Sequence, residues 1–121
     1  MTGPEKLLVI AASDDERALY ARSLARRFSA ATILEERHAA AALMSAADDG
    51  IAAIVMHYNA SPEASELLGA LRRLKPATPI VALSGIDRQS RARAQGATEF
   101  VLAQSWAELG DVVQRLFASN R

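Results

Sequence analysis

Only a few residues in this sequence have the side chains and spacing that catalysis or metal binding needs. His57 and Ser84 each follow a short apolar run, and an imidazole that activates a hydroxyl is one route to nucleophilic catalysis. Asp14 and Asp15 are neighbouring carboxylates, which are ligands that Mg²⁺ accepts. Cysteine is absent, which excludes thiolate metal sites, cysteine nucleophiles and disulfides. These four residues are therefore the first candidates for a chemical site.

Each candidate also has a purely structural interpretation. Asp14 and Asp15 fall in the first turn of an expected helix, where acids suit the positive end of the helix dipole. His57 also fits a half-exposed polar position, and Ser84 a plain hydroxyl at a strand end. The sequence contains no GxSxG, P-loop or GxGxxG motif, so the usual devices for holding a nucleophile or a phosphate are missing. We therefore expect a protein that is not an enzyme, with a small enzyme that uses His57 and Ser84 as an alternative.

Composition and charge narrow the class of protein further. The 121 residues include 14 Lys and Arg against 14 Asp and Glu, so no net field draws the chain to nucleic acid or anionic lipid. Hydrophobic residues make up 50% of the sequence, which is enough for a packed core. No stretch approaches the roughly 20 apolar residues of a membrane span, and residues 1–6 are too short and too polar for a signal peptide. We expect one cytoplasmic domain over residues 1–121.

Short apolar runs alternate with helical patterns along the whole chain, which is typical of a parallel sheet covered by helices. The runs predict five strands, at residues 7–11, 32–34, 51–56, 79–83 and 99–102. The helical patterns predict five helices, beginning at Ser13, spanning residues 39–47, running from Ser61 to Pro76, spanning residues 87–95 and beginning at Ser105. Capping boxes are predicted at Ser13 with Glu16 and at Ser105 with Glu108, and helix-ending glycines at Gly50 and Gly96.

This alternation predicts an α/β fold in which a five-stranded parallel sheet is doubly wound and covered by five helices. Right-handed crossovers leave few topologies, and we expect the flavodoxin-like strand order 2-1-3-4-5. In such a sheet a ligand lies at the carboxyl ends of the strands, near the switch point. The segments expected at that edge are residues 11–15, 57–59, 84–85 and 103–105.

Four segments resemble the receiver domains of bacterial two-component response regulators. They are Leu-Leu-Val-Ile-Ala-Ala-Ser-Asp-Asp-Glu-Arg at residues 7–17, Ile-Val-Met-His-Tyr at 54–58, Pro-Ile-Val-Ala-Leu-Ser-Gly at 79–85 and Gly-Ala-Thr-Glu-Phe-Val at 96–101. The resemblance implies a phosphoryl acceptor Asp that ends the third strand, beside Mg²⁺ held by two acids after the first strand. It also implies a Lys after the fifth strand, a Thr or Ser after the fourth and an aromatic residue on the fifth.

Most of these chemical positions are substituted in this chain. By register with the family, the acidic pair falls on Ala11 and Ala12, the phosphoryl acceptor on His57 and the Lys on Ala103. The retained positions are the hydroxyl at Ser84 and the aromatic ring at Phe100. Two methyl groups offer no ligand to Mg²⁺, which phosphoryl transfer needs to neutralise developing charge. We therefore expect a degenerate phospho-site, a pseudo-receiver, with no metal and no cofactor.

The leading hypothesis is a receiver-like domain of phosphorelay signalling that works without phosphorylation, as a module for protein interaction or dimerisation. It would regulate an output partner, either an attached domain or a separate protein, and a homodimer is a further form to test. Direct binding to nucleic acid or membrane is not expected. One alternative is a receiver with an unconventional phospho-acceptor, either His57 or one of the acids Asp14 and Asp15. The other is the small enzyme that uses His57 and Ser84.

The interaction surface is expected on the fourth helix, the fifth strand and the fifth helix, which the resemblance associates with dimers and output contacts. The fourth helix, residues 87–95, has no large apolar residue, so little burial holds it in place. Arginine forms bidentate pairs with carboxylates, which favours an acidic partner surface. The residues expected on this face are Arg88, Arg91, Arg93, Trp106, Glu108 and Asp111. For Trp106, a place in the core is an equal alternative.

Overall fold

The computed structural model describes residues 6–119, so the first five residues of the segment considered above as a signal peptide lie outside the described residues. The strands within this range are β1 (Lys6–Ile10), β2 (Thr32–Glu36), β3 (Ile51–His57), β4 (Ile80–Ser84) and β5 (Glu99–Leu102). They form one parallel sheet in the order β2-β1-β3-β4-β5, which confirms the predicted fold class and topology. The helices are α1 (Asp14–Arg27), α2 (Ala39–Ala46), α3 (Pro62–Leu74), α4 (Gln89–Gln95), the 3-10 helix η1 (Ala103–Glu108) and α5 (Leu109–Ser119).

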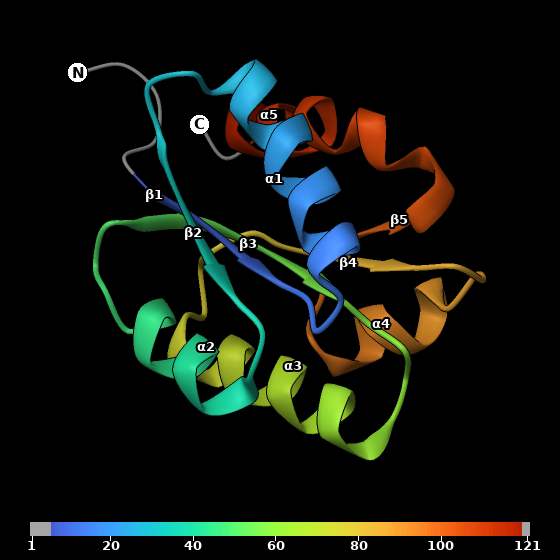
Figure 1. The fold of residues 1–121 in the computed structure, drawn as a ribbon. Coiled ribbons are helices and arrows are strands. Elements are labelled where there is room, and N and C mark those ends of the chain that lie inside the picture. Colours follow the sequence, from blue (N-terminus) through green and yellow to red (C-terminus); the bar gives the residue numbers. More distant parts are fainter. Residues whose placement is uncertain (1–5, 120–121) are drawn as a thin grey trace.

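Helices cover both faces of the sheet, with α1 and α5 on one face and α2, α3 and α4 on the other (Figure 1). Alternate residues of the central strands supply the two layers of core. In β1, Leu7 and Val9 pack toward α1 and α5, whereas Leu8 and Ile10 pack toward α2 and α3. No helix within residues 6–119 is both long enough and apolar enough to cross a lipid bilayer.

The start of α1 follows its predicted cap, whereas the start of α5 does not. The Ser13 hydroxyl accepts the backbone N–H of Glu16 at 3.2 Å, which satisfies a donor that the first helical turn leaves free. The capping box predicted at Ser105 and Glu108 is wrong, because both residues lie within η1 and the regular helix begins only at Leu109. The chain therefore makes a tight 3-10 turn between β5 and α5.

The two glycines predicted to end helices differ in the structure. Gly96 follows α4 with a φ of +128°, and a Cβ at this position would lie 2.8 Å from the Cβ of Arg72. In contrast, α2 ends at Ala46, well before Gly50. The N–H of Gly50 donates to the Asp48 carboxylate in the turn that leads to β3. Gly96 is therefore a required helix end, and Gly50 belongs to a turn.

A half-buried arginine, Arg72, fixes the segment that leads from α4 into β5. The Arg72 guanidinium donates to the Gly96 carbonyl at 2.9 Å and to the Thr98 hydroxyl at 3.0 Å. It also donates to the carbonyls of Lys75 and Thr78, at 2.9 and 2.8 Å. Burial lowers the pKa of Arg72, but these acceptors replace the water that the guanidinium loses. The end of α3 and the start of β5 are thereby held together.

Candidate functional site

The structure brings Ala11, Ala12 and His57 together at the carboxyl ends of β1 and β3. Ala11 and Ala12 follow β1 directly, and His57 is the last residue of β3. All three line one pocket of about 190 Å³, beside Arg37 and Asn59. Ala11 is buried, so its methyl group fills the position where the resemblance implies a carboxylate. Methyl groups therefore line this end of the pocket, at the positions where the resemblance implies metal ligands.

His57 faces a carboxylate and a phenol. Its Nδ1 lies 3.4 Å from the Tyr20 hydroxyl and 3.5 Å from a Glu16 carboxylate oxygen, and its side chain is 24% exposed. Burial, with the nearby Glu16 charge, raises the pKa of Tyr20, so the phenol keeps its proton and can donate to an unprotonated Nδ1. The carboxylate of Glu16 opposes the approach of a phosphate anion to this nitrogen. The two described side chains that approach Nδ1 this closely, Tyr20 and Glu16, thus supply no positive charge to balance a phosphoryl group.

Arg17 closes the β1 side of this site, and sequence reasoning missed it. Its guanidinium donates to the Ala11 carbonyl at 2.8 Å, to Asp14 at 2.7 Å and to Glu35 at 3.3 Å. Arg37 binds the same Asp14 oxygen at 3.0 Å. The hydrogen bond from Arg17 and the charge of Arg37 hold the pKa of Asp14 below its usual range. The i,i+3 spacing of Asp14 and Arg17 was the one signal in the sequence for this pairing.

These contacts define what Asp14 does in the fold. Its carboxylate, considered above as a displaced metal ligand, is shared by two guanidinium groups. Within residues 6–119, no three histidine or acidic side chains gather closely enough to form a metal site. Asp14 therefore acts as a bridge between α1 and the chain after β2.

The other half of the carboxyl edge, at β4 and β5, carries the hydroxyl and the aromatic ring that the resemblance implies, at Ser84 and Phe100. Ser84 is buried, and its hydroxyl accepts a hydrogen bond from Nε of Arg88 at 3.0 Å. Phe100 is partly buried against the core layer under α3 and α4, and Ala103 is the first residue of η1. Arg88, which is predicted for the interaction face, turns its guanidinium back to Ser84. His57 and Ser84 therefore make their hydrogen bonds to different partners, Tyr20 and Arg88.

The remaining residues of the expected interaction face divide into two groups. Arg93 binds Glu99 at 2.7 Å, and Asp111 pairs with Arg27 of α1. Trp106 packs partly buried against the core layer under α1 and α5, which places it in the core alternative. These three side chains are thus engaged within the domain.

Arg91 and Glu108, in contrast, are exposed and have no partner among the described residues. They lie on different elements, since Arg91 belongs to α4 and Glu108 ends η1. Of the six residues predicted for this face, these two are the charges that α4 and the η1–α5 segment leave available to another molecule.

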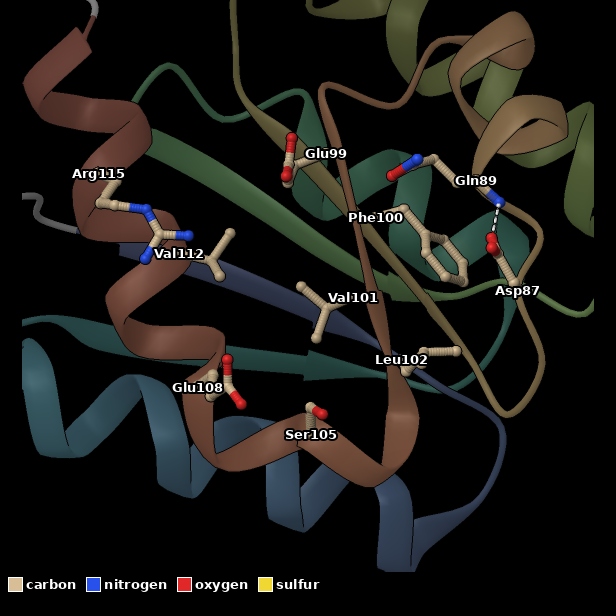
Figure 2. Close-up of a pocket in the computed structure, with 10 residues that line it drawn as sticks. All are labelled: Asp87, Gln89, Glu99, Phe100, Val101, Leu102, Ser105, Glu108, Val112 and Arg115. Atoms are coloured by element: carbon tan, nitrogen blue, oxygen red, sulfur yellow. Dashed lines mark hydrogen bonds between the residues drawn. The ribbon is translucent and has the colours of Figure 1, made fainter.

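A groove of about 340 Å³ follows the length of β5. Figure 2 shows Phe100 and Asp87 on the side of α4, and Val101, Val112 and Glu108 on the side of α5. Strand β5 forms the floor between these two walls. The predicted interaction surface is therefore hollowed along the strand rather than flat.

Solved structures resemble this arrangement across nearly the whole chain, although no protein-family model and no curated protein matches the sequence. The receiver domain of the putative response regulator NarL from Mycobacterium tuberculosis matches with a TM-score of 0.81 and 21% identity, over 99% of this chain and 100% of that one. A LuxR-family two-component response regulator from Aurantimonas sp. SI85-9A1 gives 0.81 and 20%, over 97% and 87%. The chemotaxis response regulator CheY4 of Vibrio cholerae gives 0.73 and 18%, over 94% and 99%.

The chain has a receiver-domain fold. Sequence identities of 18–21% to these three structures support a statement about the fold alone. What this receiver fold does must therefore be argued from its own residues, at the substituted carboxyl edge and at the groove along β5.

Proposed function

We propose that this receiver fold is a signalling module that is not an enzyme and that works without aspartyl phosphorylation, through contacts with a protein partner. The observation that carries the proposal is the β1–β3 end of the site. There Ala11 and Ala12 stand at the metal-binding positions of the resemblance, and His57 stands at the acceptor position, facing Glu16. A phosphoryl group placed there would meet the Glu16 carboxylate and no pair of carboxylates to hold Mg²⁺, and Arg37, which also lines this pocket, is already paired with Asp14.

The contact surface in this proposal is the face built by α4, β5 and α5. α4 is attached weakly, since Ala92 is its single buried residue, so it can adjust to a partner at small cost. Arg91 and Glu108 supply unpaired charges at this face, and the groove along β5 supplies shape. The partner is an output domain in the same polypeptide, a separate protein, or a second copy of this chain. Direct binding to nucleic acid or membrane is not part of the proposal.

The proposal is tested by incubation with acetyl phosphate and Mg²⁺, followed by intact mass spectrometry under conditions that preserve both aspartyl and histidyl phosphates. The expected result is no phosphoryl adduct on the wild-type chain. An adduct would contradict the proposal, and its loss in a single variant would name the acceptor. His57→Leu tests the histidine, with His38→Leu as the matched control on an exposed histidine, and Asp14→Asn with Asp15→Asn tests the acids.

A further inference from the structure

We propose that the free edge of β5 is a strand-docking site, at which an extended segment of a partner protein adds to the sheet antiparallel to β5. The inference rests on the proposed function, because it specifies how the α4–β5–α5 face would hold its partner. It depends on three observations: the backbone groups that β5 leaves unpaired, the walls of the groove, and the charges at the two ends of the groove.

The backbone of β5 presents donors and acceptors on its outer side. β5 is an edge strand, with β4 as its neighbour. Thr98 donates its N–H to the carbonyl of Ile80, so Thr98 and every second residue after it point toward β4. The N–H and C=O groups of Glu99 and Val101 therefore point outward, and no other described residue bonds them. Unpaired edge groups of this kind accept an added strand.

The walls of the groove suit the side chains of one extended chain. A strand beside β5 would alternate its side chains between the α4 wall and the α5 wall. On the α4 side, Leu102 is 36% exposed and Phe100 is partly buried, so apolar residues of the segment would cover them. On the α5 side, Val101 and Val112 are already buried, and Ser105 offers a polar surface. The segment would thus be apolar toward α4 and polar toward α5.

Opposite charges mark the two ends of the α5 wall. Glu108 lies at the end of the groove near the carboxyl end of β5, and Arg115 lies at the other end (Figure 2). Both side chains are exposed, and neither has a partner among residues 6–119. The seven residue steps from Glu108 to Arg115 span roughly 10 Å of helix, close to the ~13 Å between the first and fifth residues of a strand. An antiparallel segment with a base at its first position and an acid at its fifth would pair with both.

A single extended segment fits this surface better than a second copy of the domain. The α4 wall and the η1–α5 wall stand on both sides of β5 (Figure 2). In a symmetric pair each copy would bring both of its own walls to the contact, whereas paired strands must approach to about 5 Å. An isolated strand brings no walls of its own, so the occupant is a segment that is extended when it binds.

The test uses the synthetic peptide acetyl-Lys-Val-Thr-Val-Glu-amide and the isotope-labelled domain in solution. The expected result is slower amide hydrogen exchange at Glu99 and Val101, by about tenfold when nine sites in ten are occupied. Two control peptides isolate the causes. The charge-reversed sequence Glu-Val-Thr-Val-Lys should bind about fivefold more weakly, since two exposed ion pairs are lost. The peptide N-methylated at its Thr should give no protection, because it cannot donate to the edge.

A charge-swapped domain makes the test specific to this groove. Glu108→Arg with Arg115→Glu should fold normally, since both side chains are exposed, and should prefer the charge-reversed peptide. Arg22→Glu with Arg26→Glu on α1 is the matched control and should keep the original preference. The proposal is overturned by absence of protection at Val101, or by an unchanged preference in the swapped domain. Protection that rises with domain concentration alone would overturn it in favour of a second copy.

The outcome separates this inference from the proposed function. If the domain takes up no phosphoryl group and the peptide does not protect the edge of β5, the proposed function stands and strand addition is excluded. A phosphoryl adduct on the chain would contradict the proposed function, whatever the peptide does at β5.

Discussion

The carboxyl edge of the sheet consists of two halves whose residues match the receiver resemblance to different degrees. At the β1–β3 half, Ala11 and Ala12 remove the oxygen ligands that the receiver resemblance implies, and Arg17 binds the Ala11 carbonyl. At the β4–β5 half, Ser84 and Phe100 are retained, and Arg88 bonds the Ser84 hydroxyl. Both halves now end in an arginine contact made within the domain.

The resemblance implies one site that spans both halves, with a different set of residues at each half. The resemblance implies that the β1–β3 half holds metal and phosphoryl group, and the methyl groups of Ala11 and Ala12 offer no oxygen ligand there. It implies a hydroxyl and an aromatic ring at the β4–β5 half, and Ser84 and Phe100 stand at these positions. In this chain the Arg88 side chain donates a hydrogen bond to Ser84, from a position directly before α4. The half that borders the groove is therefore the one whose side chains match the resemblance.

The largest expected effect comes from rebuilding the β1–β3 half. Ala11→Asp, Ala12→Asp and His57→Asp with Ala103→Lys should create Mg²⁺-dependent uptake of phosphate from acetyl phosphate, because ligands, acceptor and cation return together. Intact mass and beryllofluoride binding would measure the gain against a wild type that shows neither.

A matched control keeps His57 and carries the other three substitutions. It should bind Mg²⁺ without forming an aspartyl phosphate on β3. A folded four-residue variant that does not bind Mg²⁺ would contradict the comparison, since it would mean that the backbone of this half has changed along with its side chains.

Much of this edge could be predicted from the sequence, because strand ends are fixed by the apolar runs before them. The runs that end at Met56 and Leu83 place His57 and Ser84 on neighbouring strands, and the structure pairs His57 with Leu83 in the sheet. Alternation of side chains then decides which layer each residue enters. Strand order follows from the alternation of strands and helices with right-handed crossovers, whereas the substituted residues were placed only by register with the family that the chain resembles.

The contacts of long side chains could not be predicted in the same way. Arg88 and Asp111 were expected on one outer face, but Arg88 turns toward Ser84 and Asp111 pairs with Arg27 on α1. A guanidinium can reach acceptors four to six residues away in several directions, and sequence spacing does not choose among them. The 3-10 helix η1 also places the start of α5 at Leu109, whereas the capping-box pattern at Ser105 and Glu108 had predicted a start at Ser105.

The two arginines should differ in their effect on stability. Arg17→Met removes a charged hydrogen bond to a backbone carbonyl and leaves Glu35 without this partner, so the free energy of unfolding should fall by about 1.5–3 kcal/mol. Arg88→Met removes one bond to a hydroxyl, and the fall should be about 1 kcal/mol. Denaturant unfolding measures both, and equal losses would show that the β4–β5 half is held as firmly as the β1–β3 half.

The smallest expected effect is a loss of stability at alkaline pH, which depends on Tyr20 in the β1–β3 half. Burial and the Glu16 charge raise the pKa of Tyr20, so the folded state keeps a phenolic proton that the unfolded chain releases near pH 10. The contribution to stability is therefore complete below about pH 10 and is lost as the pH rises further, by at most ~1.4 kcal/mol per pH unit.

In Tyr20→Phe this slope should disappear, while neutral stability changes by less than about 1 kcal/mol, since the bond to His57 is long at 3.4 Å. Urea unfolding of both proteins between pH 8 and about pH 11 gives the difference, in which all other titrations cancel. Equal slopes would mean that the phenol beside His57 is open to water, and that this half of the edge is less closed than the contacts of Arg17 and Tyr20 indicate.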